Sequence, residues 1–149
     1  MHLDDAITKD LLAKAHDVLG EDMVSVVLFG SRARGTAHPH SDVDLLIVAR
    51  ALPDEEGRDE LALDIAEIGF DYGLSFQIIL ATLEETMLSA KTDAPLMFEI
   101  YDAHRIICDK EGFFGRVIKE FAEQLRRWKA RKIKDHVWEV PGLAVPRLR

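Results

Sequence analysis

Two carboxylates and a turn of small residues are the parts of this chain whose types and spacing suit chemistry. Asp42 and Asp44 lead one apolar segment, and Gly30-Ser31 directly follows another. If the segment after the aspartates is a strand, side chains two residues apart leave the same face, so the carboxylates project together. Paired acids repel each other unless a cation lies between them. Hard oxygen ligands of this kind favour Mg2+.

The turn predicts a phosphate site beside this metal site. Gly30 allows the backbone to approach a ligand closely, and Ser31 is a residue type that caps helices. A helix that opens at Arg32 would turn free N–H groups and the positive end of its dipole toward a triphosphate. Arg32 and Arg34 are candidates to add charge there, although either position is equally typical of a solvated helix. We therefore expect a nucleoside triphosphate bridged by Mg2+.

The segment over residues 26–49 resembles the minimal nucleotidyltransferases of the DNA polymerase β superfamily. Their signature is Gly-Ser, a spacer near ten residues, and Asp-x-Asp at the start of a hydrophobic strand, and Gly30-Ser31 and Asp42-Val43-Asp44 stand at these positions. The order of elements matches over residues 23–82. The resemblance implies an α/β fold, a small mixed sheet with helices packed on it.

The resemblance also implies an activity. It is the Mg2+-dependent transfer of a nucleoside monophosphate, above all AMP from ATP, to a hydroxyl group with release of pyrophosphate. Asp42 and Asp44 would be the catalytic metal ligands, and Gly30 and Ser31 would bind the phosphates. Minimal members are often paired with a small helical partner protein in toxin–antitoxin modules, where they can adenylylate a tyrosine of the partner. Relatives that modify small molecules carry an additional acceptor-binding domain.

One position departs from the family pattern. The third carboxylate of the family lies on the strand after the intervening helix, which we expect over residues 74–80, and Gln77 stands there in its place. An amide oxygen ligates Mg2+ weakly and cannot accept a proton as a general base. The sequence thus leaves two functions open. One is an active nucleotidyltransferase, and the other is a catalytically weakened module that holds nucleotide or occupies a partner.

Length and composition indicate one globular domain. The chain has 149 residues, 48% hydrophobic and 31% charged, and we expect a single domain over 1–149 with its motif core at 23–82 and a C-terminal extension at 112–149. No apolar run approaches the ~20 residues that cross a bilayer. The acidic N-terminus is unlike a signal peptide, so the expected location is the cytoplasm.

The charge is distributed unevenly along the chain. Residues 1–115 hold 9 Lys and Arg against 23 Asp and Glu, whereas residues 116–149 hold 10 against 4. The excess of acidic residues over 1–115 argues against a protein that binds nucleic acid through its phosphates. The basic segment 126–134 has two interpretations. It contacts RNA or an acidic partner, or, as we favour, its cations complement the dipole at a helix C-terminus.

Hydrophobic periodicity predicts the elements that position these residues. A capping box at Thr82–Glu85 and a proline at position 95 mark two helix starts. An apolar stripe at helical spacing from Phe114 to Trp128 indicates a long helix that faces the core or a homodimer interface. In chain order, we expect a helix over 3–19, strands over 23–29 and 42–49, a helix over 58–69, a strand over 74–80, helices from 83 and 95, a strand over 104–108, the long helix and a short edge strand over 133–140.

Overall fold

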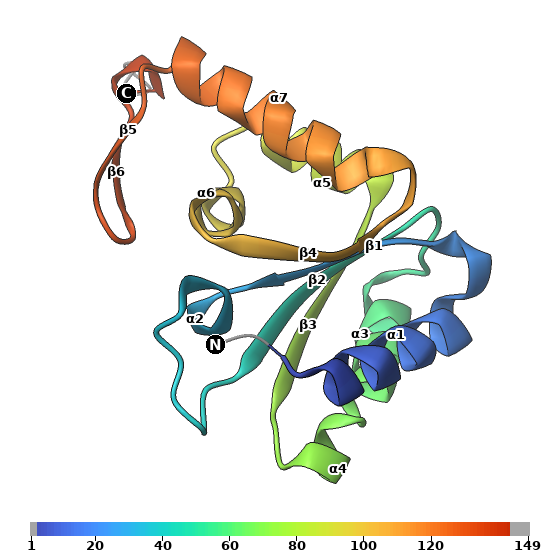
Figure 1. Cartoon of the computed structure of the whole chain (residues 1–149). Helices are drawn as coiled ribbons and strands as arrows, with labels where there is room; N and C mark the ends of the chain where they lie inside the picture. Colours follow the sequence, from blue (N-terminus) through green and yellow to red (C-terminus); the bar gives the residue numbers. More distant parts are fainter. Residues whose placement is uncertain (1–2, 144–149) are drawn as a thin grey trace.

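The computed structural model describes residues 3–143, and in that range no helix is long and apolar enough to cross a bilayer. Figure 1 shows a sheet with helices on both of its faces and a separate hairpin near the C-terminus. The elements are α1 (Asp5–Leu19), η1 (Gly20–Asp22), β1 (Met23–Phe29), α2 (Ser31–Arg34), β2 (Val43–Ala49), α3 (Glu55–Ala66), α4 (Gly69–Tyr72), β3 (Phe76–Thr82), α5 (Leu83–Ala90), α6 (Pro95–Asp102), β4 (His104–Asp109), η2 (Lys110–Gly112), α7 (Phe113–Arg127), β5 (Arg131–Lys134), β6 (Val137–Glu139) and η3 (Pro141–Leu143).

The main sheet is mixed and has the strand order β3-β2-β1-β4. Strand β1 pairs antiparallel with β2 and β4, whereas β2 and β3 are parallel. A parallel pair needs a crossover connection, and α3 and α4 provide it. The α/β fold expected from the sequence, a small mixed sheet with helices packed on it, is confirmed. Strands β3 and β4 form its two edges.

The residues of β2 divide between two hydrophobic cores because their side chains alternate. Val43, Leu45 and Ile47 belong to the core beneath α1 and α3. Leu46 and Val48 belong to the core beneath α5, α6 and α7. Asp44 is two residues before Leu46, so its side chain leaves the sheet on the α6 side. The fold thereby carries the aspartate pair to the rim of the second core.

The apolar stripe of the long helix is part of this second core. Phe114, Val117, Phe121 and Leu125 are all buried on α7 and pack over β1 and β2. Of the two expectations for this stripe, the core is therefore confirmed. The stripe leaves no exposed apolar face on α7 from which a homodimer could be built.

Two segments differ from the sequence predictions. The helix expected over 58–69 starts earlier, because the Asp54 carboxylate caps it by accepting a hydrogen bond from the Gly57 N–H at 3.0 Å, and it is divided into α3 and α4. The single edge strand expected over 133–140 is wrong. The chain reverses at His136, which has φ 65°, so the segment forms the hairpin β5–β6 outside the main sheet.

A buried network that the sequence analysis did not anticipate joins α7 to the sheet. Ser25, fully buried on β1, donates from its hydroxyl to the Asp109 carboxylate at 2.6 Å. The same carboxylate accepts hydrogen bonds from the backbone N–H groups of Phe114 at 2.9 Å and Gly115 at 3.2 Å. One acid thereby satisfies a buried hydroxyl and the first free donors of a helix.

Candidate functional site

The aspartate pair lies where β2 begins. Asp42 immediately precedes the strand and Asp44 is its second residue, half-buried against the α6 side. Burial raises the pKa of the Asp44 carboxyl above its usual value, and the negative charges of Asp42 and Glu99 raise it further. The ionised form of Asp44 is therefore poorly stabilised by the protein alone. A cation at this position would stabilise the ionised carboxylate and lower its pKa.

The turn before α2 touches this carboxylate directly. Gly30 has φ 76°, a conformation that favours glycine. A Cβ atom at this position would overlap the Oδ2 atom of Asp44 and lie 3.1 Å from its Cγ. Only glycine fits both restrictions. The turn and the aspartate pair are separated in the chain by the loop before β2, but in the structure they are parts of one site.

Ser31 does not cap the helix that follows, so that part of the sequence prediction is wrong. The N-cap of α2 is Gly30, no side chain makes a capping hydrogen bond there, and Ser31 is already the first helical residue. The reason is the backbone turn at Gly30, which places Ser31 inside the helix. Among residues 3–143, no hydrogen bond engages the Ser31 hydroxyl, which remains available to a ligand.

The two arginines of α2 have different surroundings. Arg32 is buried, and its Nε and Nη2 donate to the carbonyl oxygen of Ser41 at 3.2 and 2.9 Å. This arginine fastens the loop to α2 just before Asp42. Arg34 is different, because within the described part of the chain its buried Nε and Nη2 have no hydrogen-bond partner. Buried donor nitrogens without acceptors are costly, so these two atoms of the half-buried Arg34 are candidates for binding an anion.

Gln77 lies beside Asp44 across the parallel ladder. The two residues are partners in the register of β2 and β3, so their side chains leave the same face of the sheet. The Gln77 side chain is exposed, and its amide nitrogen is 3.5 Å from the hydroxyl of Ser75. In the described range, no group of three His, Cys, Asp or Glu residues is arranged to hold a metal.

The loop between α2 and β2 carries two histidines close to the aspartates in sequence. Both His38 and His40 are exposed, and their rings lie edge to face with centroids 6.4 Å apart. The backbone N–H of His38 donates to the Ser41 hydroxyl at 2.9 Å, and that of His40 donates to Nδ1 of His38 at 3.2 Å. These contacts shape the loop itself.

The basic C-terminal segment spans the end of α7 and the hairpin. Trp128 stacks on Phe98 with ring centroids 6.4 Å apart, and Trp138 packs against the same ring at 5.4 Å. Lys132 makes ion pairs with Asp102 at 2.7 Å and Asp135 at 3.1 Å. Both tryptophans of the chain therefore pack against Phe98 of α6, and each is half-buried.

Comparison with known proteins establishes the class. The model of the nucleotidyltransferase domain family matches residues 12–139, and the chain belongs to this family. It is 34% identical over 140 residues to a Methanocaldococcus jannaschii protein provisionally named a protein adenylyltransferase, covering 92% of this chain and 94% of that protein. It is also 30% identical over 96 residues to a Pseudomonas putida bifunctional uridylyltransferase/uridylyl-removing enzyme, which covers 64% of this chain but 10% of that enzyme.

Solved structures show the same fold. A chain from a toxin–antitoxin complex with AMP-PNP superposes with a TM-score of 0.52 at 17% identity, over 81% of this chain and 92% of that one. A chain from the complex of tri-AMPylated Shewanella oneidensis HEPN toxin with MNT antitoxin gives a TM-score of 0.53 at 14% identity, over 85% and 93%. The resemblance to the minimal nucleotidyltransferases is thereby confirmed.

Proposed function

We propose that this protein is a Mg2+-dependent adenylyltransferase that transfers AMP from ATP to a hydroxyl group on a partner protein. The observation that carries the proposal is the contact between Gly30 and the Asp44 carboxylate, which unites a phosphate-sized turn with two metal-ligating acids. The provisional name of the archaeal relative supports the adenylyl group and a protein acceptor. The similarity to toxin–antitoxin structures, one with AMP-PNP and one with an AMPylated toxin, supports the same choice.

The donor set fits a magnesium ion that arrives with the nucleotide. Asp42 and Asp44 supply two carboxylates, and the Gln77 amide could add a weak oxygen ligand. Mg2+ usually keeps several waters and takes one or two carboxylates together with substrate phosphates. The raised pKa of Asp44 gives such an ion a clear energetic role, because it would offset the burial and repulsion of that acid. When bound, the metal would neutralise charge that develops on the transferred phosphate.

The phosphates would meet the turn and α2. The Ser31 hydroxyl has no partner among the described residues, and Arg34 presents two buried guanidinium nitrogens without acceptors. Both are donors that a phosphate oxygen satisfies. Arg32, in contrast, is engaged by the carbonyl of Ser41 and holds the loop. We therefore assign phosphate binding to Gly30, Ser31 and Arg34, and a positioning role to Arg32.

The reaction is an in-line displacement at phosphorus. The acceptor oxygen forms a bond to the α-phosphorus while the bond to the pyrophosphate oxygen breaks, and pyrophosphate leaves. The hydroxyl proton must go to water or to a carboxylate of the pair, because the Gln77 amide cannot accept it. Positioning then supplies most of the acceleration, and turnover is slow compared with a site that has three acids.

The second candidate function is a catalytically weakened module that binds nucleotide or a partner protein. Gln77, in register with Asp44, is the observation that favours it. One experiment separates the two. The protein is incubated with ATP labelled at the α-phosphate, Mg2+ and the small helical protein encoded beside its gene, if one exists. Label on the partner, lost in Asp42→Asn/Asp44→Asn, supports the enzyme. Mg2+-dependent ATP binding without label on any protein and without pyrophosphate release supports the nucleotide-binding module. Absence of ATP binding contradicts the enzyme and leaves only a module that binds a partner protein.

A further inference from the structure

One edge of the main sheet lacks the charges, prolines and bulges that usually protect an edge strand. Strand β3 pairs with β2 over all seven residues without a register shift, and among the described residues its other side has no strand partner. Its sequence from Phe76 to Thr82 contains no charged residue and no proline. Soluble proteins normally protect an edge of this length with charges, prolines or bulges, because its backbone is a template for another strand.

The opposite edge shows the contrast. Strand β4 contains Arg105 and ends at Asp109, and its pairing with β1 is interrupted by a register shift between Val26 and Val27. These are the devices that discourage the addition of a further strand. Only one edge of this sheet is therefore prepared for pairing.

The ladder identifies the backbone groups that are free. The Val43 N–H donates to the Ser75 carbonyl at 2.9 Å, and the alternation of a parallel ladder then turns the N–H and C=O groups of Phe76, Ile78 and Leu80 away from β2. Within the described residues none of these groups has a hydrogen-bond partner. An added strand would satisfy them in turn.

Two hollows lie along this edge. One, of about 620 Å³, is lined by Leu63, Phe70, Leu74 and Phe76 among others. The second, of about 550 Å³, is lined by Ala62, Ile78 and Ile79 together with charged residues of α3. They adjoin Phe76 and Ile78, which are two residues apart on β3, roughly 7 Å along a strand. That is the spacing of two side chains on one face of an extended peptide.

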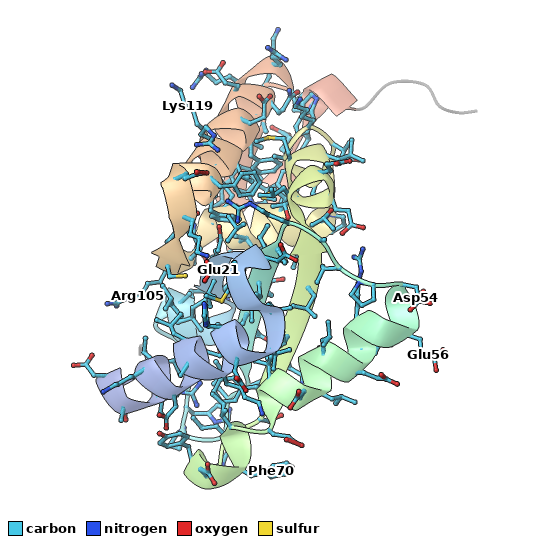
Figure 2. All side chains as sticks on the ribbon, turned by 90° about the vertical axis from the view of Figure 1, so that its right-hand side faces the viewer. Glu21, Asp54, Glu56, Phe70, Arg105 and Lys119 are labelled. Carbon is cyan, nitrogen blue, oxygen red and sulfur yellow. The ribbon has the colours of Figure 1, made fainter. Side chains whose placement is uncertain are left out.

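The first hollow is bordered by apolar side chains that are unusually exposed. Phe70 is 86% exposed and Leu63 is 70% exposed, and Figure 2 shows Phe70 projecting clear of the ribbon at α4. Isolated exposed apolar residues are common, but two of them beside a hollow and a bare strand edge are typical of an interaction surface. The hollow would take an apolar side chain of the partner.

The charges around this edge define the partner further. Between Glu55 and Asp71 the chain carries seven acidic residues and one basic residue, Arg58, which is paired with Glu85 at 2.7 Å. Glu55, Asp59 and Glu85 line the second hollow. A second copy of this chain, paired strand to strand across a twofold axis, would bring acids against acids. A positively charged partner avoids this repulsion.

We propose that the free edge of β3 binds an extended, basic segment of a partner protein by strand addition. The backbone of the segment pairs with Phe76, Ile78 and Leu80. One apolar side chain enters the hollow beside Phe70, and basic side chains face Glu55 and Asp59. Main-chain hydrogen bonds supply affinity and the hollows supply specificity, as in other cases of strand addition. This surface is separate from the phosphate turn and does not depend on catalysis.

The test uses labelled nine-residue peptides in which valine alternates with lysine, and a matched peptide in which valine alternates with glutamate. Fluorescence anisotropy measures binding to the full chain, and amide chemical shifts locate it. We expect the lysine peptide to bind at least tenfold more tightly and to shift resonances of β3, α3 and α4. Equal affinity for the two peptides, or shifts confined to other elements, would overturn the proposal.

Three variants make the test specific to this edge. Ile78→Pro removes an outward N–H without touching the ladder to β2, and Phe70→Asp fills the hollow with charge on an exposed side chain that folding does not need. Asp59→Lys removes a facing acid and is compared with Asp93→Lys, an equal charge change at an exposed position away from the edge. We expect binding to fall at least fivefold in the first three and to be unchanged in the control. A β3-mediated homodimer, seen by sedimentation and lost in Ile78→Pro, would replace the basic partner with a second copy and refute the proposal.

Discussion

Asp44 and Gln77 are partners across the parallel ladder of β2 and β3, and their side chains leave the same face of the sheet. An amide thus stands beside the acid that we propose as a metal ligand. A carboxylate at position 77 would be close enough to share an ion with Asp44, whereas the amide adds neither charge nor a proton acceptor. Under the proposed function, the residue at position 77 would influence how fast the site transfers a nucleotide.

Gln77→Asp should therefore increase nucleotidyl transfer. If general-base help is the missing contribution, the gain is about 10²-fold, measured as pyrophosphate release at saturating ATP and Mg2+. The variant should also melt at a lower temperature in chelator and recover with Mg2+, because a third acid repels the other two in the absence of metal. Gln77→Asn keeps the amide and is the control. A Gln77→Asp protein that is as slow as wild type would show that the proton does not leave through this position.

Asp44→Asn should have opposite effects on stability and on ligand binding. The pKa of Asp44 is higher in the folded protein, chiefly because of burial, so the folded state binds the proton more tightly than the unfolded state. The contribution of Asp44 to the free energy of unfolding is then most favourable at low pH and falls as the pH rises through the window from about 4 upward. Without metal, Asp44→Asn should raise the melting temperature at pH 7 and flatten this pH dependence.

The same substitution should abolish the Mg2+-dependent part of ATP binding in calorimetry. Asp93→Asn, which removes an exposed carboxylate away from the site, is expected to change neither property. A variant that binds ATP with undiminished Mg2+ dependence would mean that the ion is held elsewhere.

Ser31→Ala should weaken triphosphate binding without weakening the fold. The hydroxyl makes no capping hydrogen bond, so the melting temperature should stay within a degree or so of wild type. Loss of one hydrogen bond to a charged phosphate costs about 1–2 kcal/mol, which calorimetry with ATP resolves. AMP binding should change less, because we propose that Ser31 binds the β- and γ-phosphates, which AMP lacks. Equal losses for ATP and AMP would contradict that assignment.

Asp109→Ala should destabilise the protein by about 1–3 kcal/mol, since it leaves the buried Ser25 hydroxyl and the first N–H groups of α7 without an acceptor. Ser25→Ala removes only one donor and should cost about 1 kcal/mol. The double variant should cost less than the sum, because the two residues share one network. Urea denaturation measures all three, and additive losses would show that the network is not cooperative.

The sequence predicted the central strands of the main sheet better than the hairpin outside it. Continuous apolar runs marked β1 and β2 because both faces of these strands are covered, and Thr82 with Glu85 marked the start of α5 through a capping box that the structure contains. The hairpin β5–β6 was not predicted, since its strands are exposed and polar and so lack a periodic signal. Its reversal depends on a positive φ at His136, for which the residue type gives only a weak indication.

The candidate site was likewise predictable only in part. The side-by-side placement of Asp42 and Asp44 and their proximity to the turn were readable, because strand alternation and motif spacing determine both. The different surroundings of Arg32 and Arg34 were not predictable. The two residues lie in the same short helix, and the sequence does not indicate which guanidinium contacts the Ser41 carbonyl. Asp109 was missed for a related reason, as its partner Ser25 is 84 positions away in sequence.

The bond between Arg32 and Ser41 has an evolutionary consequence. Because the guanidinium grips a main-chain carbonyl, it places the start of β2 whatever side chains occupy the positions in between. We therefore expect substitutions among residues 36–40 to alter the shape of the loop more than the position of Ser41, next to Asp42. Substitutions in this surface loop could therefore change which molecules reach the proposed nucleotide site during evolution. The hydrogen bonds between Arg32 and Ser41 would keep the start of β2 in place.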